Sequence, residues 1–321
     1  MKRRTATIAL LSALMFAPLT FAADFPQRPI KIIVPFPAGG ASDFLTRVVA
    51  EEMAKGLGVS VVTENRPGGG SLVGTLSVLK TAPDGYTLLL VANSFLLNSR
   101  LRAKPPYDAM ADFVPVSFLA RSPQIFAVRQ DHPARTLQEF LEQARSRPGT
   151  LTYGTNGPGT AQHVAGEMLK KVSRVDLMYV PYPGGAPTIT SLLGGHIDLV
   201  IVNHGDIASQ LKAGSARALA TGTARRVEAL PDVPTVAESG FPGFEISAWF
   251  GFVAPQGTPA PIVDRLGQQV ARALSLPEVR ARLSNLSMEL VGSNGSEFGA
   301  FMRGEITGAV SVAQEAGVRL E

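Results

Sequence analysis

From Pro29 onward, short runs rich in valine, isoleucine and leucine alternate with segments of helical periodicity. The order strand, helix, strand, helix, strand is predicted over residues 30–34, 42–55, 59–63, 71–80 and 86–91. Such alternation is typical of parallel α/β layers, because a helix carries the chain from the end of one strand back to the start of the next. The first third of the chain is therefore predicted to form a wound α/β sheet.

A second series of the same kind follows residues 118–128. Its strands are predicted at 151–153, 175–180, 197–202 and 216–221, and its helices at 136–145, 160–171 and 187–193. The remainder is too rich in helix to stand alone, with a strand at 248–254 and helices at 259–274, 277–286 and 297–314. We therefore predict that residues 24–121 and 248–321 form one discontinuous domain. Residues 122–247 would form a second domain inserted into it, with a hinge at the two crossings.

The N-terminus has the three parts of a secretory signal peptide. Lys2, Arg3 and Arg4 precede an apolar run over 8–19, and a segment with small residues then ends at Ala22, where we expect cleavage. About a dozen apolar residues are too few to cross ~30 Å of hydrocarbon, so a membrane anchor is the weaker interpretation. We therefore expect a periplasmic protein whose signal peptide is residues 1–22.

Charge and composition exclude several kinds of function. The chain has 30 lysines and arginines against 26 aspartates and glutamates, and loss of the signal peptide leaves 27 against 26, a net charge of +1. Because the basic residues of the mature chain are dispersed, we expect no nucleic-acid partner. The chain has no cysteine, which excludes a disulfide framework, a zinc–thiolate site and a cysteine nucleophile.

Glycine and proline gather at three junctions between a predicted strand and a predicted helix. These junctions are residues 35–43, a near copy at 181–187, and a third at 153–160. Glycine lets the backbone turn sharply and approach a ligand, and Ser42 is the expected N-cap of the first helix. The free N–H groups at a helix start attract an anion.

In an open parallel sheet, ligands bind beyond the carboxyl ends of the strands, where these junctions lie. Two such domains facing each other would hold a small anion between two sets of helix starts, as a clamshell receptor does. For each loop taken alone, a tight turn without a ligand is the competing interpretation. The paired loops in both halves favour a binding site.

Motifs of nucleotide binding and catalysis are missing from the sequence. It contains no G-x-x-x-x-G-K-[ST], no G-x-G-x-x-G at a strand-to-helix turn and no G-x-S-x-G. Three histidines stand near a carboxylate: His163 with Glu167, His196 with Asp198, and His204 with Asp206. No third ligand completes a metal site, so structural roles are expected. We therefore expect no enzyme, no metal and no cofactor. Trp249 is either a core residue or part of a pocket lining.

A series of motifs runs in a fixed order along the mature chain. It comprises Pro35-Phe36-Pro37-Ala38-Gly39-Gly40-Ala41-Ser42-Asp43, Glu64-Asn65-Arg66-Pro67-Gly68-Gly69-Gly70, Pro83-Asp84-Gly85-Tyr86-Thr87-Leu88, the segment from Tyr153-Gly154 to His163, Val180-Pro181-Tyr182, Gly194-Gly195-His196-Ile197-Asp198, Trp249-Phe250-Gly251 and Ala254-Pro255-Gln256-Gly257-Thr258-Pro259. In this order the motifs resemble those of the tripartite tricarboxylate transporter solute receptors, also called Bug receptors. Agreement in order over the whole mature chain is more specific than any one motif.

The resemblance implies a type II periplasmic binding protein with two domains in the Venus flytrap arrangement, each a wound sheet flanked by helices. Such a receptor captures a small carboxylate by domain closure and delivers it to the membrane permease subunits of a tripartite tricarboxylate transporter. We expect it to act as a monomer.

The resemblance also implies that backbone amides and hydroxyls hold the carboxylate. Carried over to this sequence, the ligand-binding residues of the first domain are Phe36, Ala38, Gly39, Ser42, Asp43, Asn93 and Ser94. Those of the second domain are Thr155, Gly157, Thr160, His163, Tyr182, Pro183, Gly184 and Asn203.

Two other functions stay open from the sequence. One is an extracytoplasmic carboxylate sensor whose loaded form signals to a receptor kinase. The other is a secreted hydrolase or isomerase on a receptor-like fold, against which the missing nucleophile motif counts. Which carboxylate is bound depends on side chains whose spatial arrangement a sequence does not give.

Overall fold

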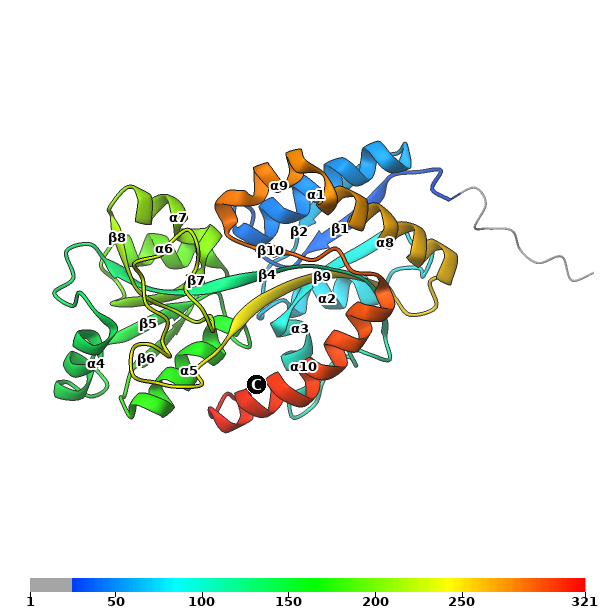
Figure 1. Cartoon of the computed structure of the whole chain (residues 1–321). Coiled ribbons are helices and arrows are strands. Elements are labelled where there is room, and N and C mark those ends of the chain that lie inside the picture. The colour runs from blue at the N-terminus through cyan, green and yellow to red at the C-terminus, as the bar shows by residue number, and fades with distance from the viewer. Residues whose placement is uncertain (1–24, 321) are drawn as a thin grey trace, which may run out of the picture.

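The computed structural model describes residues 25–320, and the predicted signal peptide with its cleavage site near Ala22 lies outside them. The described chain forms two α/β lobes that lie side by side along one long strand, β4 (Phe113–Arg129) (Figure 1). No helix among the described residues is long and apolar enough to cross a membrane.

The first lobe is built from the two ends of the described chain. Its elements up to β4 are β1 (Ile30–Val34), α1 (Ala41–Leu57), β2 (Val61–Asn65), α2 (Leu72–Leu79), β3 (Thr87–Ala92) and α3 (Asn93–Arg100). After the second lobe the chain returns through β9 (Ser247–Pro255), α8 (Ala260–Ser275), α9 (Pro277–Leu283), a 3-10 turn (Ser284–Leu286), β10 (Glu289–Leu290) and α10 (Gly295–Glu315).

The second lobe is built from the middle of the chain. Its elements are α4 (Leu137–Ser146), β5 (Thr152–Thr155), α5 (Ala161–Ser173), β6 (Met178–Pro181), α6 (Gly185–Leu193), β7 (Leu199–Asn203), α7 (His204–Lys212) and β8 (Ala216–Thr221). The wound α/β fold predicted from the alternation is confirmed, whereas helices α3 and α7 were not predicted. Each of these two helices starts directly after a strand with polar residues, which look like a turn in the sequence.

Strand β4 joins the two sheets because it exchanges partners along its length. Residues 113–123 pair with β9 in the first sheet, whose order is β2-β1-β3-β9-β4. From Gln124 onward β4 pairs with β7 and β8 of the second sheet, where β7, β5 and β6 follow one another. The exchange between Pro123 and Gln124 lies where the first domain crossing is predicted; the domain boundaries themselves stay a prediction.

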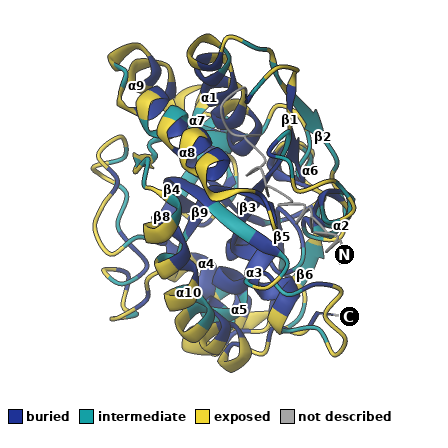
Figure 2. Cartoon of the chain, turned by 90° about the vertical axis from the view of Figure 1, so that its right-hand side faces the viewer, coloured by how far each residue is buried: buried dark blue, intermediate teal, exposed yellow. Residues whose placement is uncertain are grey.

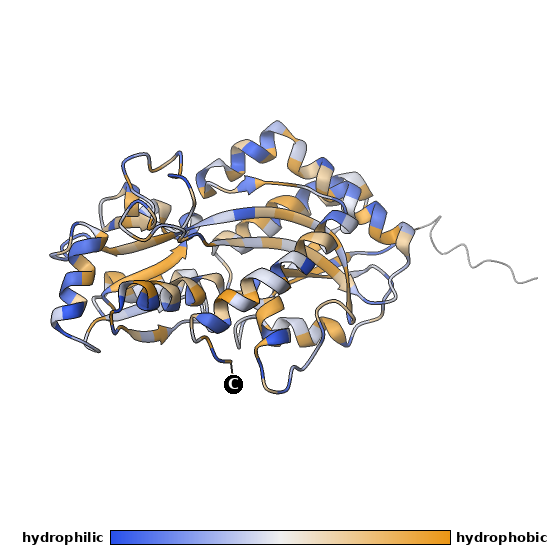
Figure 3. Ribbon diagram, turned by 60° about the horizontal axis from the view of Figure 1, so that its bottom comes forward, coloured by the Kyte–Doolittle hydropathy of each residue, from blue (hydrophilic) through white to orange (hydrophobic). Residues whose placement is uncertain are grey.

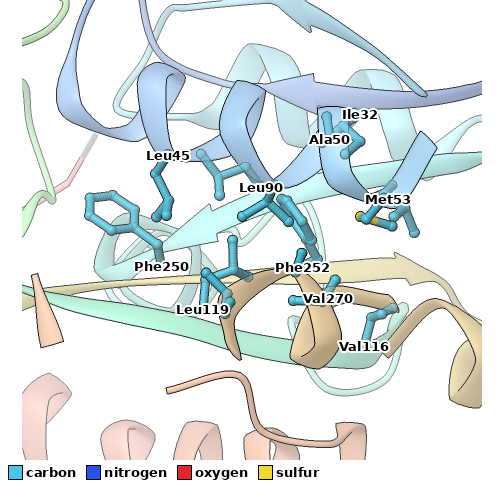
Figure 4. Close-up of a cluster of buried hydrophobic side chains, with 14 of the residues drawn as sticks. Ile32, Leu45, Ala50, Met53, Leu90, Val116, Leu119, Phe250, Phe252 and Val270 are labelled. Atoms are coloured by element: carbon cyan, nitrogen blue, oxygen red, sulfur yellow. The ribbon is translucent and has the colours of Figure 1, made fainter. Parts of the chain in front are cut away.

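Each sheet has helices on both faces, so its strands are buried on both sides. Leu88 and Leu90 of β3 point into the cluster under α1 and α8, whereas Leu89 and Val91 point into the cluster under α2, α3 and α10. This is the two-residue period of a strand, and a strand buried on both faces appears in the sequence as a continuous apolar run. Figure 4 shows the first of these clusters, where Leu45 of α1 faces Leu90 and Phe250.

The second lobe is layered in the same way. Helices α4 and α5 cover one face of its sheet, with Phe140 and Leu169 in the core, and α6 and α7 cover the other face with Leu192 and Ile207. The outer sides of the helices are exposed (Figure 2), and the strands between them are the more continuous apolar segments (Figure 3). Both sheets thus hold their strand ends rigidly, which positions the loops that follow.

Candidate functional site

Five helices begin at one cavity between the two lobes. They are α1 and α3 of the first lobe and α5, α6 and α7 of the second. The lining residues are Phe36, Pro37, Ala38, Gly40, Ser42, Ala92, Asn93, Ser94, Ala248 and Phe250 on the first lobe, and Asn156, Thr160, Ala161, Gln162, Gly184, Gly185, Ala186, Asn203 and Asp206 on the second. The first N–H groups of a helix have no partner within it and carry the positive end of its dipole. The cavity therefore suits an anion.

The loop before α1 reaches the cavity through its backbone. Gly39 has φ of +84°, a left-handed conformation that favours glycine, and its N–H donates to Asp43 Oδ2 at 3.0 Å. The predicted N-cap role of Ser42 is wrong: Gly40 takes the N-cap position, without a side-chain cap, and Ser42 is the second residue of the helix. Ser42 instead lines the cavity.

Asp43 is turned away from the cavity and stabilises the first lobe. Its carboxylate accepts from Arg47 at 3.0 Å and from the Asn65 side-chain amide at 2.9 Å, besides the N–H of Gly39. Burial alone would raise the pKa of Asp43, but these hydrogen bonds and the Arg47 charge hold it below its usual value of 3.8. The structure therefore gives Asp43 a supporting position, and neither Asp43 nor Gly39 lines the cavity.

The loop before α5 lies across the cavity from α1. Thr160 is the N-cap of α5: its hydroxyl accepts from the N–H of His163 at 3.3 Å and donates to the carbonyl of Gly157 at 2.7 Å. Thr160 lines the cavity, whereas Thr155, Gly157 and His163 lie behind it. Thr155 is fully buried, and its hydroxyl oxygen accepts a hydrogen bond from the N–H of Gly157 at 3.3 Å. These three residues shape the loop.

His163 is a neutral, packed histidine. Its ring stacks on Tyr179 with 4.2 Å between the centroids, and its Nδ1 accepts from the N–H of Gly159 at 3.2 Å. Burial lowers the pKa of His163 to about 4. The carboxylate expected to accompany it, Glu167, is bound by the Tyr153 hydroxyl and by Lys170, so the pair is a structural one. No cluster of three possible metal ligands occurs within residues 25–320.

The loop before α6 brings the second lobe against the first. A Cβ atom on Gly184 would lie 2.6 Å from Cδ of Pro37, so only glycine leaves room for this approach. Gly184 lines the cavity, while Tyr182 and Pro183 do not; the Tyr182 hydroxyl pairs with Ser191. The contact shows that the two proline-glycine loops meet across the cleft.

Asn93, Ser94 and Asn203, which the family resemblance implies as ligand contacts, all line the cavity. Asn93 accepts from the N–H of Trp249 at 3.1 Å, and the hydroxyl of Ser94 pairs with that of Ser71 at 2.8 Å. Trp249 itself packs among Phe298 and Phe301 and donates its indole N–H to Glu305 at 2.9 Å. Trp249 is therefore buried in the core and also lines a second cavity, together with Phe301 and Glu305, while its neighbours Ala248 and Phe250 supply the wall of the first cavity.

The sequence did not single out Asp206 as a ligand-site residue. Its Oδ1 accepts from the N–H of Ala41 at 2.7 Å, and its Oδ2 accepts from the side-chain amides of Asn203 and Asn156 at 2.9 and 3.1 Å. Because Ala41 begins α1 of the first lobe, the bond to Oδ1 crosses the cleft. Burial raises the pKa of Asp206 against the effect of these hydrogen bonds.

Two signals in the sequence point toward this residue. Asp206 follows the end of a buried strand by three positions, and an aspartate early in a helix is favoured by the dipole. Helix α7 was missed, however, so His204 and Asp206 were considered only as a metal pair. The buried cavity wall formed by Asn156, Gln162 and Gly185 was likewise not predicted.

A fold of two α/β lobes, with converging helix starts in the cleft between them, defines the class of periplasmic solute-binding proteins. The family model described as "Tripartite tricarboxylate transporter family receptor" matches residues 45–318. The chain is 33% identical to Protein BugT of Bordetella pertussis over 324 residues, which cover 100% of this chain and 99% of the relative. The chain thus belongs to the tripartite tricarboxylate transporter receptor family, as the ordered motifs predict.

Two solved structures extend this likeness to the whole fold. One is Rpa4515 of R. palustris with adipate, with a TM-score of 0.89 and 33% identity, covering 92% of this chain and 99% of that one. The other is MatC of Rhodopseudomonas palustris with bound malate, with a TM-score of 0.85 and 31% identity, covering 90% and 100%. Both of these similar proteins hold a small carboxylate.

Proposed function

We propose that this protein is a periplasmic receptor that captures a small carboxylate in the cavity between its lobes and delivers it to a tripartite tricarboxylate-type membrane transporter. The observation that carries this is the convergence of five helix starts on one enclosed space. Adipate and malate in the two similar structures support a carboxylate as the ligand. A signal peptide cleaved near Ala22 would export the chain, and a monomer without cofactor would bind without turning the ligand over.

Neutral donors suit reversible capture. Backbone N–H groups stabilise a carboxylate through charge-assisted hydrogen bonds, yet they add no opposite formal charge that would hold it too tightly for release. Of the residues predicted from the resemblance, Phe36, Ala38, Ser42, Asn93, Ser94, Thr160, Gly184 and Asn203 line the space where these donors meet. We propose that these residues contact the ligand and that the other predicted residues support their loops.

Domain closure would complete the site. Residues 24–121 with 248–321 and residues 122–247 would move about β4 and the segment before β9. Contacts that form only between closed lobes, such as Ala41 N–H to Asp206 and Gly184 against Pro37, supply part of the closed state's stability. A ligand that bridges the lobes shifts the population toward that state, because it gains contacts there that the open state lacks.

The binding test removes one amide donor without breaking its helix. Ala161 is the first residue of α5, a position where proline is tolerated, and the preceding Thr160 has ψ of 162°, close to the range that a following proline accepts. Ala161→Pro should weaken carboxylate binding at least about tenfold in calorimetry, since a hydrogen bond to a charged group contributes about 1.5–3 kcal/mol. Ala260→Pro makes the same change at the first residue of α8, away from the cavity lining, and should leave affinity unchanged.

Flat calorimetry over a broad panel of mono- and dicarboxylates would overturn the proposed function. Equal affinities for the wild type and Ala161→Pro would instead remove α5 from the site. Delivery is tested by uptake: deletion of the receptor gene should abolish uptake of the labelled ligand. Normal uptake together with a lost transcriptional response to the ligand would favour the sensor.

A further inference from the structure

We propose that the ligand carries one carboxylate and, at its other end, an ammonium or amide N–H donor that pairs with Asp206 and Asn156. This inference rests on the proposed function, because it narrows the ligand class for the same cavity. It departs from the dicarboxylates adipate and malate held by the two similar structures.

The first argument is the charge of the cavity wall. Among the described residues that line it, Asp206 is the one with a formal charge. A ligand carboxylate at the free N–H groups that begin α5 and α6 would leave the second end of a dicarboxylate among the same lining residues, with no cation to meet it. Like charges that face each other in an enclosed site cost several kcal/mol. A single carboxylate avoids that repulsion.

The second argument is an acceptor without a donor. Asn156 lines the cavity at 9% exposure, and no donor among the described residues reaches its Oδ1. Its amide nitrogen donates to Asp206 Oδ2 at 3.1 Å, which fixes the orientation of the amide. A buried acceptor left unpaired costs about 1–3 kcal/mol, so this position favours a ligand that brings an N–H group.

The third argument is the remaining capacity of Asp206. A carboxylate oxygen accepts about two hydrogen bonds; Oδ2 already has two, from Asn203 and Asn156, whereas Oδ1 has one, from Ala41. One acceptor position on Oδ1 is therefore open. Asp206 Oδ1 and Asn156 Oδ1 thus each have one acceptor position left for a donor group of the ligand.

Two glycines leave a confined space for the Asp206 carboxylate. A Cβ atom on Gly185 would lie 2.5 Å from Cγ of Asp206, and one on Gly40 would lie 3.3 Å from Oδ1. Neither glycine has positive φ, so space rather than backbone conformation is what they provide. The two glycine loops thus enclose a carboxylate that belongs to the protein itself, in the kind of environment expected for a ligand anion.

Hydrogen bonds from α5 and β4 fix the orientation of Asn203, which contacts Asp206. Asn203 Oδ1 accepts from the side-chain amides of Gln162 at 2.9 Å and Gln124 at 3.2 Å. The amide nitrogen of Asn203 must then face Asp206, to which it donates. Asp206 is therefore held in place by a residue of its own lobe, and it presents a hydrogen-bond acceptor to the cavity.

The test uses matched ligand pairs of equal chain length: succinate with 4-aminobutyrate, glutarate with 5-aminopentanoate, and adipate with 6-aminohexanoate. The corresponding monoamides separate a neutral N–H donor from an ammonium group. Calorimetry at pH 7 should show at least about tenfold tighter binding of the best amino acid or monoamide than of its dicarboxylate partner. Asp206→Asn should narrow this ratio to below about threefold, while Asp264→Asn, an exposed carboxylate of α8, should leave it unchanged.

The outcomes separate the two proposals. A wild type that binds a dicarboxylate as tightly as its amino partner overturns this inference and leaves the receptor function standing. A wild type that binds none of these compounds, nor any other carboxylate, overturns the receptor function itself. If Asp206→Asn does not fold, Asn156→Ala, which removes the unpaired acceptor, should still reduce the ratio, and an unchanged ratio would contradict the inference.

Discussion

Helices α1 and α7 both have an aspartate as their third residue, but the two aspartates have different roles. Asp43 is the third residue of α1 and Asp206 is the third residue of α7. Asp43 turns back to its own lobe, where Arg47 is 3.0 Å away, and its pKa lies below the usual value. Asp206 reaches the opposite lobe and is bound by neutral N–H donors, and burial raises its pKa.

The difference teaches that helix position alone does not decide the role of an early aspartate. Both carboxylates gain from the helix dipole, but only Asp43 also gains a cation, which makes it part of the scaffold. Asp206 has no such partner among the cavity residues, so its charge remains available to select a ligand. Three predictions test this contrast, in order of expected effect.

The largest effect is expected at Asp43. Asp43→Asn removes the charge that binds the half-exposed Arg47 and the N–H of Gly39. It should lower the free energy of unfolding by about 3 kcal/mol, because a buried carboxylate loses charge-assisted hydrogen bonds. Urea denaturation measures this. Asp264→Asn on the exposed side of α8 should stay within about 0.5 kcal/mol of the wild type. A loss at Asp43 as small as that at Asp264 would contradict the scaffold role.

A middle-sized effect is expected where Gly185 meets Asp206. Gly185→Ala should destabilise the protein by about 2 kcal/mol, because its Cβ would lie 2.5 Å from Cγ of Asp206. In an Asp206→Ala background the same change should cost about 1 kcal/mol less, since the crowding carboxylate is gone. Gly308→Ala, in open space within α10, should be neutral or stabilising. Additive costs for the two changes would show that Asp206 is not what excludes a side chain at Gly185.

The smallest expected effect concerns pH and has opposite signs at the two aspartates. Asp43 has a folded-state pKa below the ordinary 3.8, so its stabilisation is present above that value and is lost as pH falls through the folded pKa. Asp206 has a folded-state pKa above 3.8, so the folded protein takes up the proton first and gains stability as pH falls toward 3.8.

The corresponding measurement compares unfolding free energies from pH 7 down to pH 3. The wild type should gain stability relative to Asp206→Asn as pH falls toward 3.8, and should lose stability relative to Asp43→Asn below 3.8. If the stability differences between the wild type and the two variants changed with pH in the same direction, the proposed electrostatic contrast between Asp43 and Asp206 would be wrong.

Most of the fold could be predicted from the sequence because its signals are local. Strands such as β1 and β7 are short apolar runs, and α8 carries an amphipathic period with proline near its start. Helices α3 and α7 escaped prediction because they begin without a connecting loop, at Asn93 and His204, where polar residues suggest a turn. Family membership followed from the order of motifs, which needs no geometry.

The site was predicted only in part, for a reason that the loops make clear. Spacing located the loops at the strand ends, but not which side of each loop faces the cavity: Ser42 faces it, while Thr155 and His163 pack behind. Within a loop, neighbouring residues point in different directions according to local hydrogen bonds. Those bonds depend on partners such as Tyr179, whose hydroxyl pairs with that of Thr155 and which the chain brings close only on folding.

The sequence by itself determined the α/β layers, the glycine loops at the strand ends and the family, because apolar period and motif order are properties of neighbouring residues. Only the tertiary structure decided the role of Asp206. Its decisive partner is the N–H of Ala41, which is 165 residues away in the chain and lies on the opposite lobe. The environment of a charge is set by the atoms packed around it, and two lobes that meet across a cleft supply atoms that no local pattern reveals.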